Sequence, residues 1–157
     1  MKPREDLLND AMRRLEPLVG EWDVTLTHAW FLDSMNTEIH GTATIEWYAD
    51  AFLLLRSSFP GRSADQGGSA WGMAFSRNDP RDTFVALYND DRGVSRVFDM
   101  SFADGVWTLL REDPDFHQRL AIRIGEDRLD WRADASEDAG QSWRKDLDYV
   151  FVRRRLP

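Results

Sequence analysis

The stretch from Ala70 to Gly105 reads AWGMAFSRNDPRDTFVALYNDDRGVSRVFDMSFADG and decides the fold. Within it, apolar residues alternate with small or polar residues in successive runs, and clusters rich in Asn, Asp, Pro and Gly separate these runs. Alternation with a period of two is typical of β-strands with one buried face, and such clusters are typical of turns. Because no connection is long enough for a crossover helix, consecutive strands are expected to be antiparallel.

The same pattern continues in both directions from this stretch. We predict ten strands, at residues 21–28, 38–48, 51–58, 70–77, 81–89, 92–102, 105–111, 116–124, 127–136 and 142–154. So many strands in one small domain leave exposed edges unless the sheet closes, so the fold class is mainly β, an antiparallel up-and-down β-barrel. Segments 29–37 and 60–69 are expected to be loops near a barrel mouth.

One helix is predicted before the barrel. Leu7, Leu8, Met12, Leu15 and Leu18 recur at helical spacing between charged residues. Pro17 and Gly20 then supply stop signals, so an amphipathic α-helix is expected over about residues 4–16.

The composition bounds the class of protein. A chain of 157 residues has the size of one domain, so a single domain over 1–157 is expected. The net charge of -8 argues against binding to nucleic acid, and the short apolar runs argue against a membrane partner. The absence of cysteine and of an apolar leader stretch at the start favours a cytoplasmic location. The sequence leaves open whether two barrels form a homodimer.

Alternation assigns the inward face of several strands. The inward set comprises Trp22, Val24 and Leu26; Trp71, Met73 and Phe75; Leu129, Trp131 and Ala133; and Trp143, Leu147, Tyr149 and Phe151, with Lys145 as an exception on that last face. For strand 105–111 two faces compete, one with Trp107, Leu109 and Arg111 and the other with Val106, Thr108 and Leu110. The aromatic residues either fill a core or line a cavity.

Polar residues on inward faces are more discriminating, because burial without a partner costs about 1–3 kcal/mol. Arg96 is in register with Phe98, and Gln118 is in register with Leu120. Two accounts of Arg96 stay open: it pairs with a buried carboxylate or extends to the rim, or it meets an anionic or carbonyl-bearing ligand. The predicted ligand-binding residues are Trp71, Met73, Phe75, Arg96, Phe98, Arg111, Gln118, Trp131 and Tyr149.

The sequence offers little support for metal, nucleotide or hydrolase chemistry. His28, His40 and His117 have no ligating neighbour at useful spacing, and neither a P-loop nor a Gly-x-Ser-x-Gly motif occurs, so no metal site is expected. The carboxylates at positions 99, 130, 134, 146 and 148 fall on polar faces and are expected to be solvated and paired with arginines. Glu46 is also expected to be solvated, unless its strand turns the polar face inward, where it would act as a general base.

Several motifs together resemble a known group. These are Leu18-Val19-Gly20-Glu21-Trp22, then residues 88–98 (YNDDRGVSRVF), Gly105-Val106-Trp107, residues 111–119 (REDPDFHQR) and residues 143–149 (WRKDLDY). The first resembles the entrance motif of lipocalins and calycins, and the set is similar to an uncharacterised bacterial lipocalin-like group allied to the nitrobindin fold.

This resemblance implies a ten-stranded barrel closed at one end. Trp22 is expected to pack in the closed end against an arginine of the last strand, Arg153 or Arg154. Nitrobindins hold haem through a histidine near the carboxyl end of the barrel. Here the last histidine is His117, so haem ranks low and no cofactor is expected.

Three functions follow from these observations. The first is binding of a small, mostly apolar molecule inside the barrel, with Arg96 and Gln118 fixing its polar end. The second is a cyclase- or isomerase-type enzyme in the same cavity, with Tyr149 or Glu46 moving a proton. The third is a fully packed structural barrel.

Overall fold

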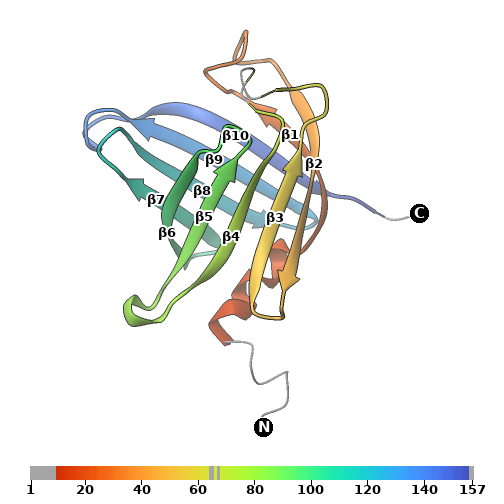
Figure 1. Cartoon of the computed structure of the whole chain (residues 1–157), viewed down its shortest axis with the longest axis vertical. Coiled ribbons are helices and arrows are strands. Elements are labelled where there is room, and N and C mark those ends of the chain that lie inside the picture. Colours follow the sequence, from red (N-terminus) through yellow and green to blue (C-terminus); the bar gives the residue numbers. More distant parts are fainter. Residues whose placement is uncertain (1–9, 64–65, 67, 156–157) are drawn as a thin grey trace.

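The computed structural model describes residues 10–63, 66 and 68–155. Within these residues the chain forms ten strands: β1 (Gly20–Thr27), β2 (Ile39–Tyr48), β3 (Phe52–Ser58), β4 (Trp71–Asn78), β5 (Thr83–Asp90), β6 (Ser95–Ala103), β7 (Val106–Glu112), β8 (His117–Gly125), β9 (Arg128–Ser136) and β10 (Arg144–Arg153). Each strand pairs with its sequence neighbours in antiparallel fashion, and β10 pairs with β1 (Figure 1). The predicted closed up-and-down barrel is therefore confirmed.

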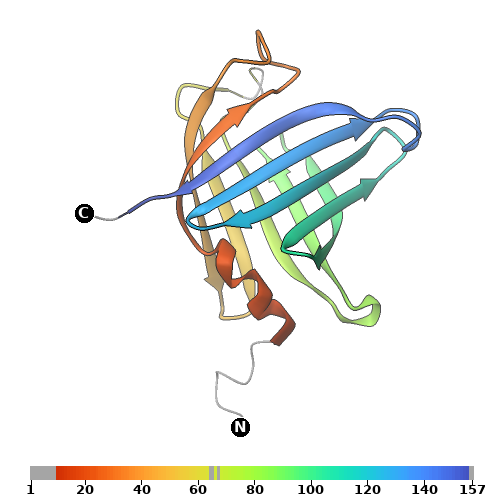
Figure 2. The same cartoon turned by 180° about the vertical axis from the view of Figure 1, so that it is seen from behind.

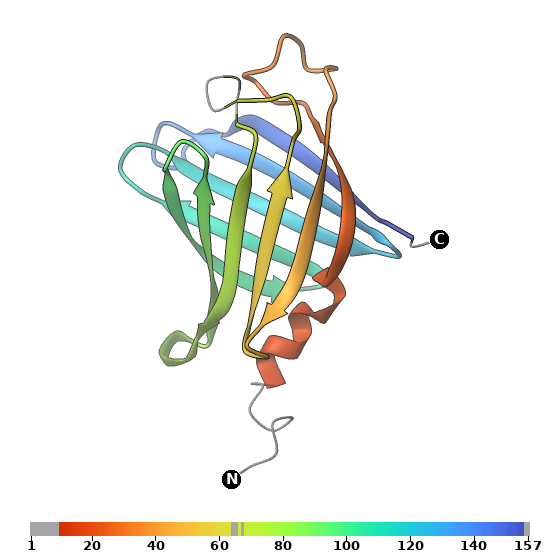
Figure 3. The ribbon, with the colours of Figure 1, turned by 45° about the vertical axis from the view of Figure 1, so that its right-hand side comes forward.

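The seam between the first and last strands closes the barrel. Trp22 lies opposite Ala43 of β2 on one side and opposite Arg153 of β10 on the other, so β1 has no free edge. Figure 3 shows β10 running beside β1, and Figure 2 shows from behind the wall that β7 to β10 form. Closure pairs the backbone groups that an open sheet of this size would leave exposed at its edges.

The segment before β1 differs from the expected α-helix. It is a 3-10 helix, η2 (Asp10–Leu18), and the predicted residues 4–9 lie outside the described residues. Apolar residues three or four apart suit both kinds of helix, so the spacing did not distinguish them. The helix also continues through Pro17, because Leu18 is fully buried and its carbonyl oxygen accepts a hydrogen bond from Trp22 Nε1 at 3.0 Å.

Trp22 and Arg153 form the closed end of the barrel next to η2. Trp22 is buried, and the Arg153 guanidinium lies 4.3 Å from its ring centroid. Arg153 also donates to the carbonyl oxygen of Val19 at 2.6 Å and to Asp127 Oδ1 at 3.0 Å. The packing of Trp22 against an arginine of the last strand is thus confirmed, and the arginine is Arg153.

The half of the interior nearest η2 is packed with large apolar side chains. Its buried members include Phe75, Phe84, Trp107, Leu109, Ile122, Leu129 and Phe151. Stacking of Trp131 on Phe151, with ring centroids 5.0 Å apart, continues this packing toward the middle of the barrel. The two alternatives for strand 105–111 are also decided, since Trp107, Leu109 and Arg111 are buried whereas Thr108 is exposed.

A β-bulge in β10 changes the predicted faces of the last strand. Lys145 pairs with Asp134 and Leu147 with Ala133, so Asp146 is an additional residue without a partner in β9. A bulge reverses the alternation that precedes it. Lys145 therefore lies on the outer face, where it contacts Asp148 at 2.7 Å, and Trp143 also lies outside, beneath Arg119. The inward assignment of Trp143 is wrong for this reason.

Candidate functional site

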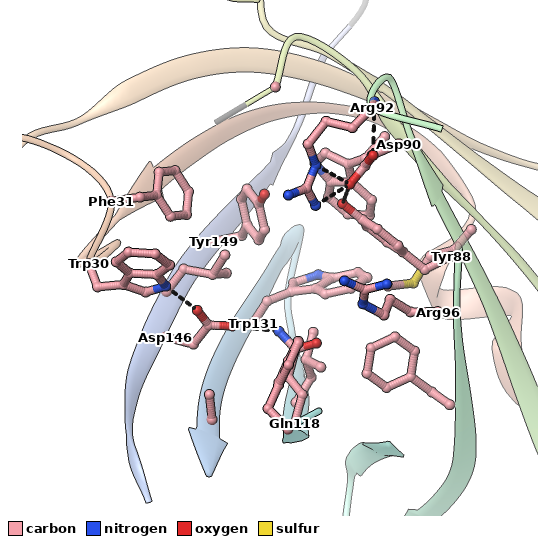
Figure 4. A pocket seen from close by; sticks show the side chains of 18 of the residues that line it. Trp30, Phe31, Tyr88, Asp90, Arg92, Arg96, Gln118, Trp131, Asp146 and Tyr149 are labelled. Carbon is pink, nitrogen blue, oxygen red and sulfur yellow. Dashed lines mark hydrogen bonds and ion pairs between the residues drawn. The ribbon is translucent and has the colours of Figure 1, made fainter. Parts of the chain in front are cut away.

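A cavity of about 680 Å³ occupies the end of the barrel opposite η2 (Figure 4). In an up-and-down barrel alternate connections lie at the same end, and here the connections β1–β2, β3–β4, β5–β6, β7–β8 and β9–β10 surround the mouth. The lining residues are Trp30, Phe31, Gly68, Ala70, Trp71, Met73, Tyr88, Asp90, Arg92, Arg96, Phe98, Asp115, Phe116, Gln118, Leu120, Trp131, Ala135, Glu137, Arg144, Asp146, Leu147 and Tyr149.

One wall of the cavity is a continuous aromatic surface. The ring of Trp71 on β4 lies 5.9 Å from Tyr88 of β5, 5.9 Å from Trp131 of β9 and 5.2 Å from Tyr149 of β10. Met73 and Phe98 extend the apolar lining. These positions were expected from strand alternation to face the interior, and they suit contact with an apolar or aromatic ligand.

Phe75, the third inward residue of β4, lies beyond the cavity. It is completely buried in the packed half of the barrel and does not line the cavity, although it was included among the ligand-binding residues. Alternation assigns a side chain to a face of a strand, but it does not give the height at which packing ends and open space begins. Phe75 is therefore a core residue.

Arg96 lies on β6, and its half-buried side chain lines the cavity opposite Asp146 in Figure 4. Its guanidinium donates to the backbone oxygen of Ser95 at 3.0 Å and lies 5.6 Å from the ring centroid of Phe116. Among the described residues no carboxylate lies within 4.0 Å of it. The alternative in which Arg96 pairs with a buried carboxylate is therefore wrong.

The other two cavity arginines are paired. Arg92 Nη2 lies 2.6 Å from Asp90 Oδ2, and Arg144 Nη2 lies 3.3 Å from Glu137 Oε1. A guanidinium stays charged at any physiological pH, so Arg96 presents an uncompensated cation to the cavity. A ligand carboxylate, sulfonate or carbonyl oxygen can accept its hydrogen bonds.

Tyr88 and Asp90 join Arg92 in a small network that sequence reasoning missed. Tyr88 Oη donates to Asp90 Oδ2 at 2.8 Å. Burial opposes ionisation of Asp90, but hydrogen bonds from Arg92 and Tyr88 outweigh it and lower the pKa of Asp90. Burial and the hydrogen bond to Asp90 raise the pKa of Tyr88. Residues 89–93 were interpreted only as a turn, although Tyr88 precedes it on the same alternating face as Ala86.

Tyr149 lies on the aromatic wall as a neutral phenol. Burial, with a smaller contribution from the charge of Asp146, raises the pKa of Tyr149 well above its ordinary value. A phenol that keeps its proton at neutral pH does not serve as a proton acceptor there. Tyr149 is thus suited to ligand contact rather than to the general-base role.

Asp146 is a cavity residue, which corrects the prediction that it would be solvated. Its Oδ1 accepts a hydrogen bond from Trp30 Nε1 at 2.9 Å, and its Oδ2 accepts one from Gln118 Nε2. Burial raises the pKa of Asp146, and the hydrogen bonds from Gln118 and Trp30 oppose this rise. The physical reason for the error is the bulge, which turns Asp146 from the outer face to the inner one.

Gln118 lies in the lining as expected, but its amide nitrogen is occupied by Asp146. Trp30 comes from the β1–β2 connection, and its backbone nitrogen donates to the backbone oxygen of Asp146 at 3.2 Å. The bulge therefore also anchors this connection at the mouth. Trp30 and Phe31 were interpreted only as part of a loop.

Arg111 and Glu46 do not reach the cavity. Arg111 is buried, but its guanidinium contacts Asp113 at 3.0 Å, Asp115 at 2.8 Å and the backbone oxygen of Phe116 at 2.9 Å. These contacts hold the β7–β8 connection, so Arg111 has a structural role instead of the expected ligand contact. Glu46 is exposed and pairs with Arg56 at 2.8 Å on the outer face, which contradicts its role as a general base.

The histidines do not fit haem ligation in the cavity. None of His28, His40 and His117 belongs to the lining, so the cavity offers no imidazole to a haem iron. His28 Nδ1 lies 2.9 Å from Asp148 Oδ2 at an exposed position. Across residues 10–63, 66 and 68–155, no three or more His, Asp or Glu side chains are arranged to hold a metal ion. The described helices also include none that is long and apolar enough to cross a membrane.

Comparison with known proteins supports the fold. No protein-family model matches the chain, and no curated protein matches it. Among solved structures, the crystal structure of Rv2717c from M. tuberculosis superposes with a TM-score of 0.61 at 16% sequence identity. The match covers 94% of this chain and 99% of that chain. At this identity the likeness shows the fold alone: the chain has the same barrel architecture as Rv2717c, a nitrobindin-family β-barrel.

Proposed function

We propose that this barrel binds a small, mostly apolar molecule that carries an anionic or carbonyl end. The observation that carries the proposal is the Arg96 guanidinium, which lines the cavity with no carboxylate partner among the described residues. The aromatic wall of Trp71, Trp131 and Tyr149 supplies the apolar contact.

The open space supports a binding role over a packed structural barrel. Small-molecule pockets commonly have volumes of about 300–1,000 Å³ and combine apolar walls with a few polar groups. The cavity of about 680 Å³ lies within that range and has this composition. The enzymatic alternative loses both proton acceptors expected from the sequence, since Glu46 lies outside the barrel and Tyr149 keeps its proton.

The test is a fluorescence titration with two matched dyes. Anilinonaphthalenesulfonate has an aromatic body with a sulfonate, and N-phenylnaphthylamine has the same body without the charge. Loss of a charge-assisted hydrogen bond costs about 1.5–3 kcal/mol, and the partial exposure of Arg96 favours the lower end. Arg96→Leu is therefore expected to weaken binding of the sulfonate about 10-fold and leave the affinity of the neutral dye unchanged.

The matched control is Arg123→Leu, which removes the same charge from an exposed position on the outer face of β8. This variant should bind both dyes as the wild type does. Equal affinity of the wild type and Arg96→Leu for the sulfonate would refute the proposal. Unfolding of Arg96→Leu at ordinary temperature would do so as well, because it would show a structural role for the arginine.

A further inference from the structure

Asp146 is a second charged group at the cavity without a counter-ion. Its side chain is about 8% exposed, and both carboxylate oxygens accept hydrogen bonds from neutral donors, Trp30 and Gln118. In the described part of the chain, no Lys, Arg or His nitrogen lies within 4.0 Å of this carboxylate. Each carboxylate oxygen keeps a further lone pair for another donor.

The bulge explains why this carboxylate is not neutralised by the adjacent lysine. Lys145 points to the outer face, where its Nζ lies 2.7 Å from Asp148 and 3.7 Å from Asp134. The next arginine, Arg144, pairs with Glu137 and lies over the ring of Trp30. A buried carboxylate held only by neutral donors has an unfavourable environment, which an additional donor from a ligand would improve.

Asp146 and Arg96 face the cavity from nearly opposite sides. They belong to β10 and β6, which are separated by β7, β8 and β9 along one side of the ten-stranded ring. In Figure 4 Asp146 lies with Trp30 and Gln118 on one side of the cavity, and Arg96 lies with Tyr88 on the other. The cavity thus has a free cation at one wall and a carboxyl at the opposite wall.

We propose that the ligand is dipolar: its anionic or carbonyl end binds Arg96, and an amine or hydroxyl at the far end of an apolar body donates to Asp146. This inference rests on the proposed function and specifies its ligand class. The distance between the two side chains selects the length of the apolar body, and the aromatic wall contacts that body between its two polar ends.

The test compares two acids that differ only at the far end of a flexible chain, dodecanoate and ω-aminododecanoate, as competitors of anilinonaphthalenesulfonate. In an apolar cavity without Asp146, burial of an unpaired ammonium would weaken binding by a factor of about 100 or more. With Asp146 as acceptor, the wild type should bind the amino acid at least as tightly as dodecanoate. Weaker binding of the amino acid by 10-fold or more would overturn the inference.

Asp146→Asn provides the second arm. The amide is isosteric and can still accept from Trp30, so the barrel should fold, while the preference for the amino acid over dodecanoate should fall at least 10-fold. Asp99→Asn removes a carboxylate from the exposed outer face of β6 and should leave the preference unchanged. An unchanged preference in Asp146→Asn would overturn the inference.

The two proposals fail in different ways. If dodecanoate displaces the dye but ω-aminododecanoate is rejected, binding of an apolar anion stands and the role of Asp146 falls. If neither acid displaces the dye from the wild type, both proposals fall. In Arg96→Leu the affinities for both acids should drop by the same factor, because both share the carboxylate.

Discussion

The guanidinium of Arg153 is expected to stabilise the closed end of the barrel, and Arg153→Met is the perturbation that measures this. Methionine keeps much of the aliphatic length but removes every hydrogen bond. The lost contacts are those to Val19 at 2.6 Å, to Asp127 at 3.0 Å and to the ring of Trp22 at 4.3 Å. Together these contacts tie η2, β1, β9 and β10 to one side chain.

The magnitude follows from the kind and exposure of each contact. A hydrogen bond from a charged donor contributes about 1.5–3 kcal/mol, and a partly exposed cation–π contact about 0.5–1 kcal/mol. The pair with Asp127 contributes about 0.2–1 kcal/mol, because its side chains are 33% and 43% exposed. One group makes all three contacts, so the sum is not additive, and we expect a loss of about 2–4 kcal/mol in the free energy of unfolding.

Urea unfolding followed by tryptophan fluorescence measures this loss, and the melting temperature should fall by about 5–10 °C. Arg155→Met is the control, since Arg155 approaches the same Asp127 at 3.6 Å but is 87% exposed. Its loss should stay below about 0.5 kcal/mol. If Arg153→Met and Arg155→Met unfold at the same urea concentration, the proposed role of Arg153 at the closed end is refuted.

Two further predictions concern the core and the buried carboxyl. Phe75→Ala should lower the free energy of unfolding by about 3–5 kcal/mol yet leave the affinity for anilinonaphthalenesulfonate unchanged, because Phe75 lies in the packed half; a dye affinity that fell with stability would contradict this boundary. Burial, opposed by Gln118, Trp30 and Arg144, raises the pKa of Asp146 above 3.8, so the folded chain binds this proton more tightly than the unfolded chain. The urea midpoint of the wild type should therefore rise relative to that of Asp146→Asn as the pH falls from neutral to below 3.8, and a constant difference would contradict the burial.

The barrel could be predicted from the sequence because its signals are local and repeated. Each strand announces its buried face by alternation, and each turn by Asp, Asn or Gly, so the ten strands and their antiparallel order need no long-range information. Trp71, Met73, Phe98 and Trp131 line the cavity for the same reason. Burial of an apolar side chain fixes the register of a strand at every second residue.

The errors arise where one event interrupts this periodicity. The bulge between Lys145 and Leu147 inserts a single residue, and nothing in the local composition marks it except Lys145 itself on an apolar face. That exception was the available signal: a lysine among inward residues indicates that the phase of the strand changes nearby. The same event moved Asp146 into the cavity and Trp143 out of it.

Partners of buried polar groups form a second class that alternation cannot supply. Arg111 was assigned to the interior, but only the structure shows that Asp113 and Asp115 already satisfy its guanidinium. Arg96 has a similar place in its strand and lacks such partners. The difference depends on how a connection folds back over the strand, and this depends on contacts between residues of different elements.

The two ends of this barrel have separate duties. The packed half, with η2 and the Trp22–Arg153 contact, holds the strands in register, whereas the connections at the opposite end surround a space that the strands do not need for their own pairing. Substitutions around the mouth can therefore alter what enters the barrel without unfolding it. An architecture divided in this way can diverge as far as 16% identity and still keep its outline, since selection on the bound molecule and selection on folding act on different residues.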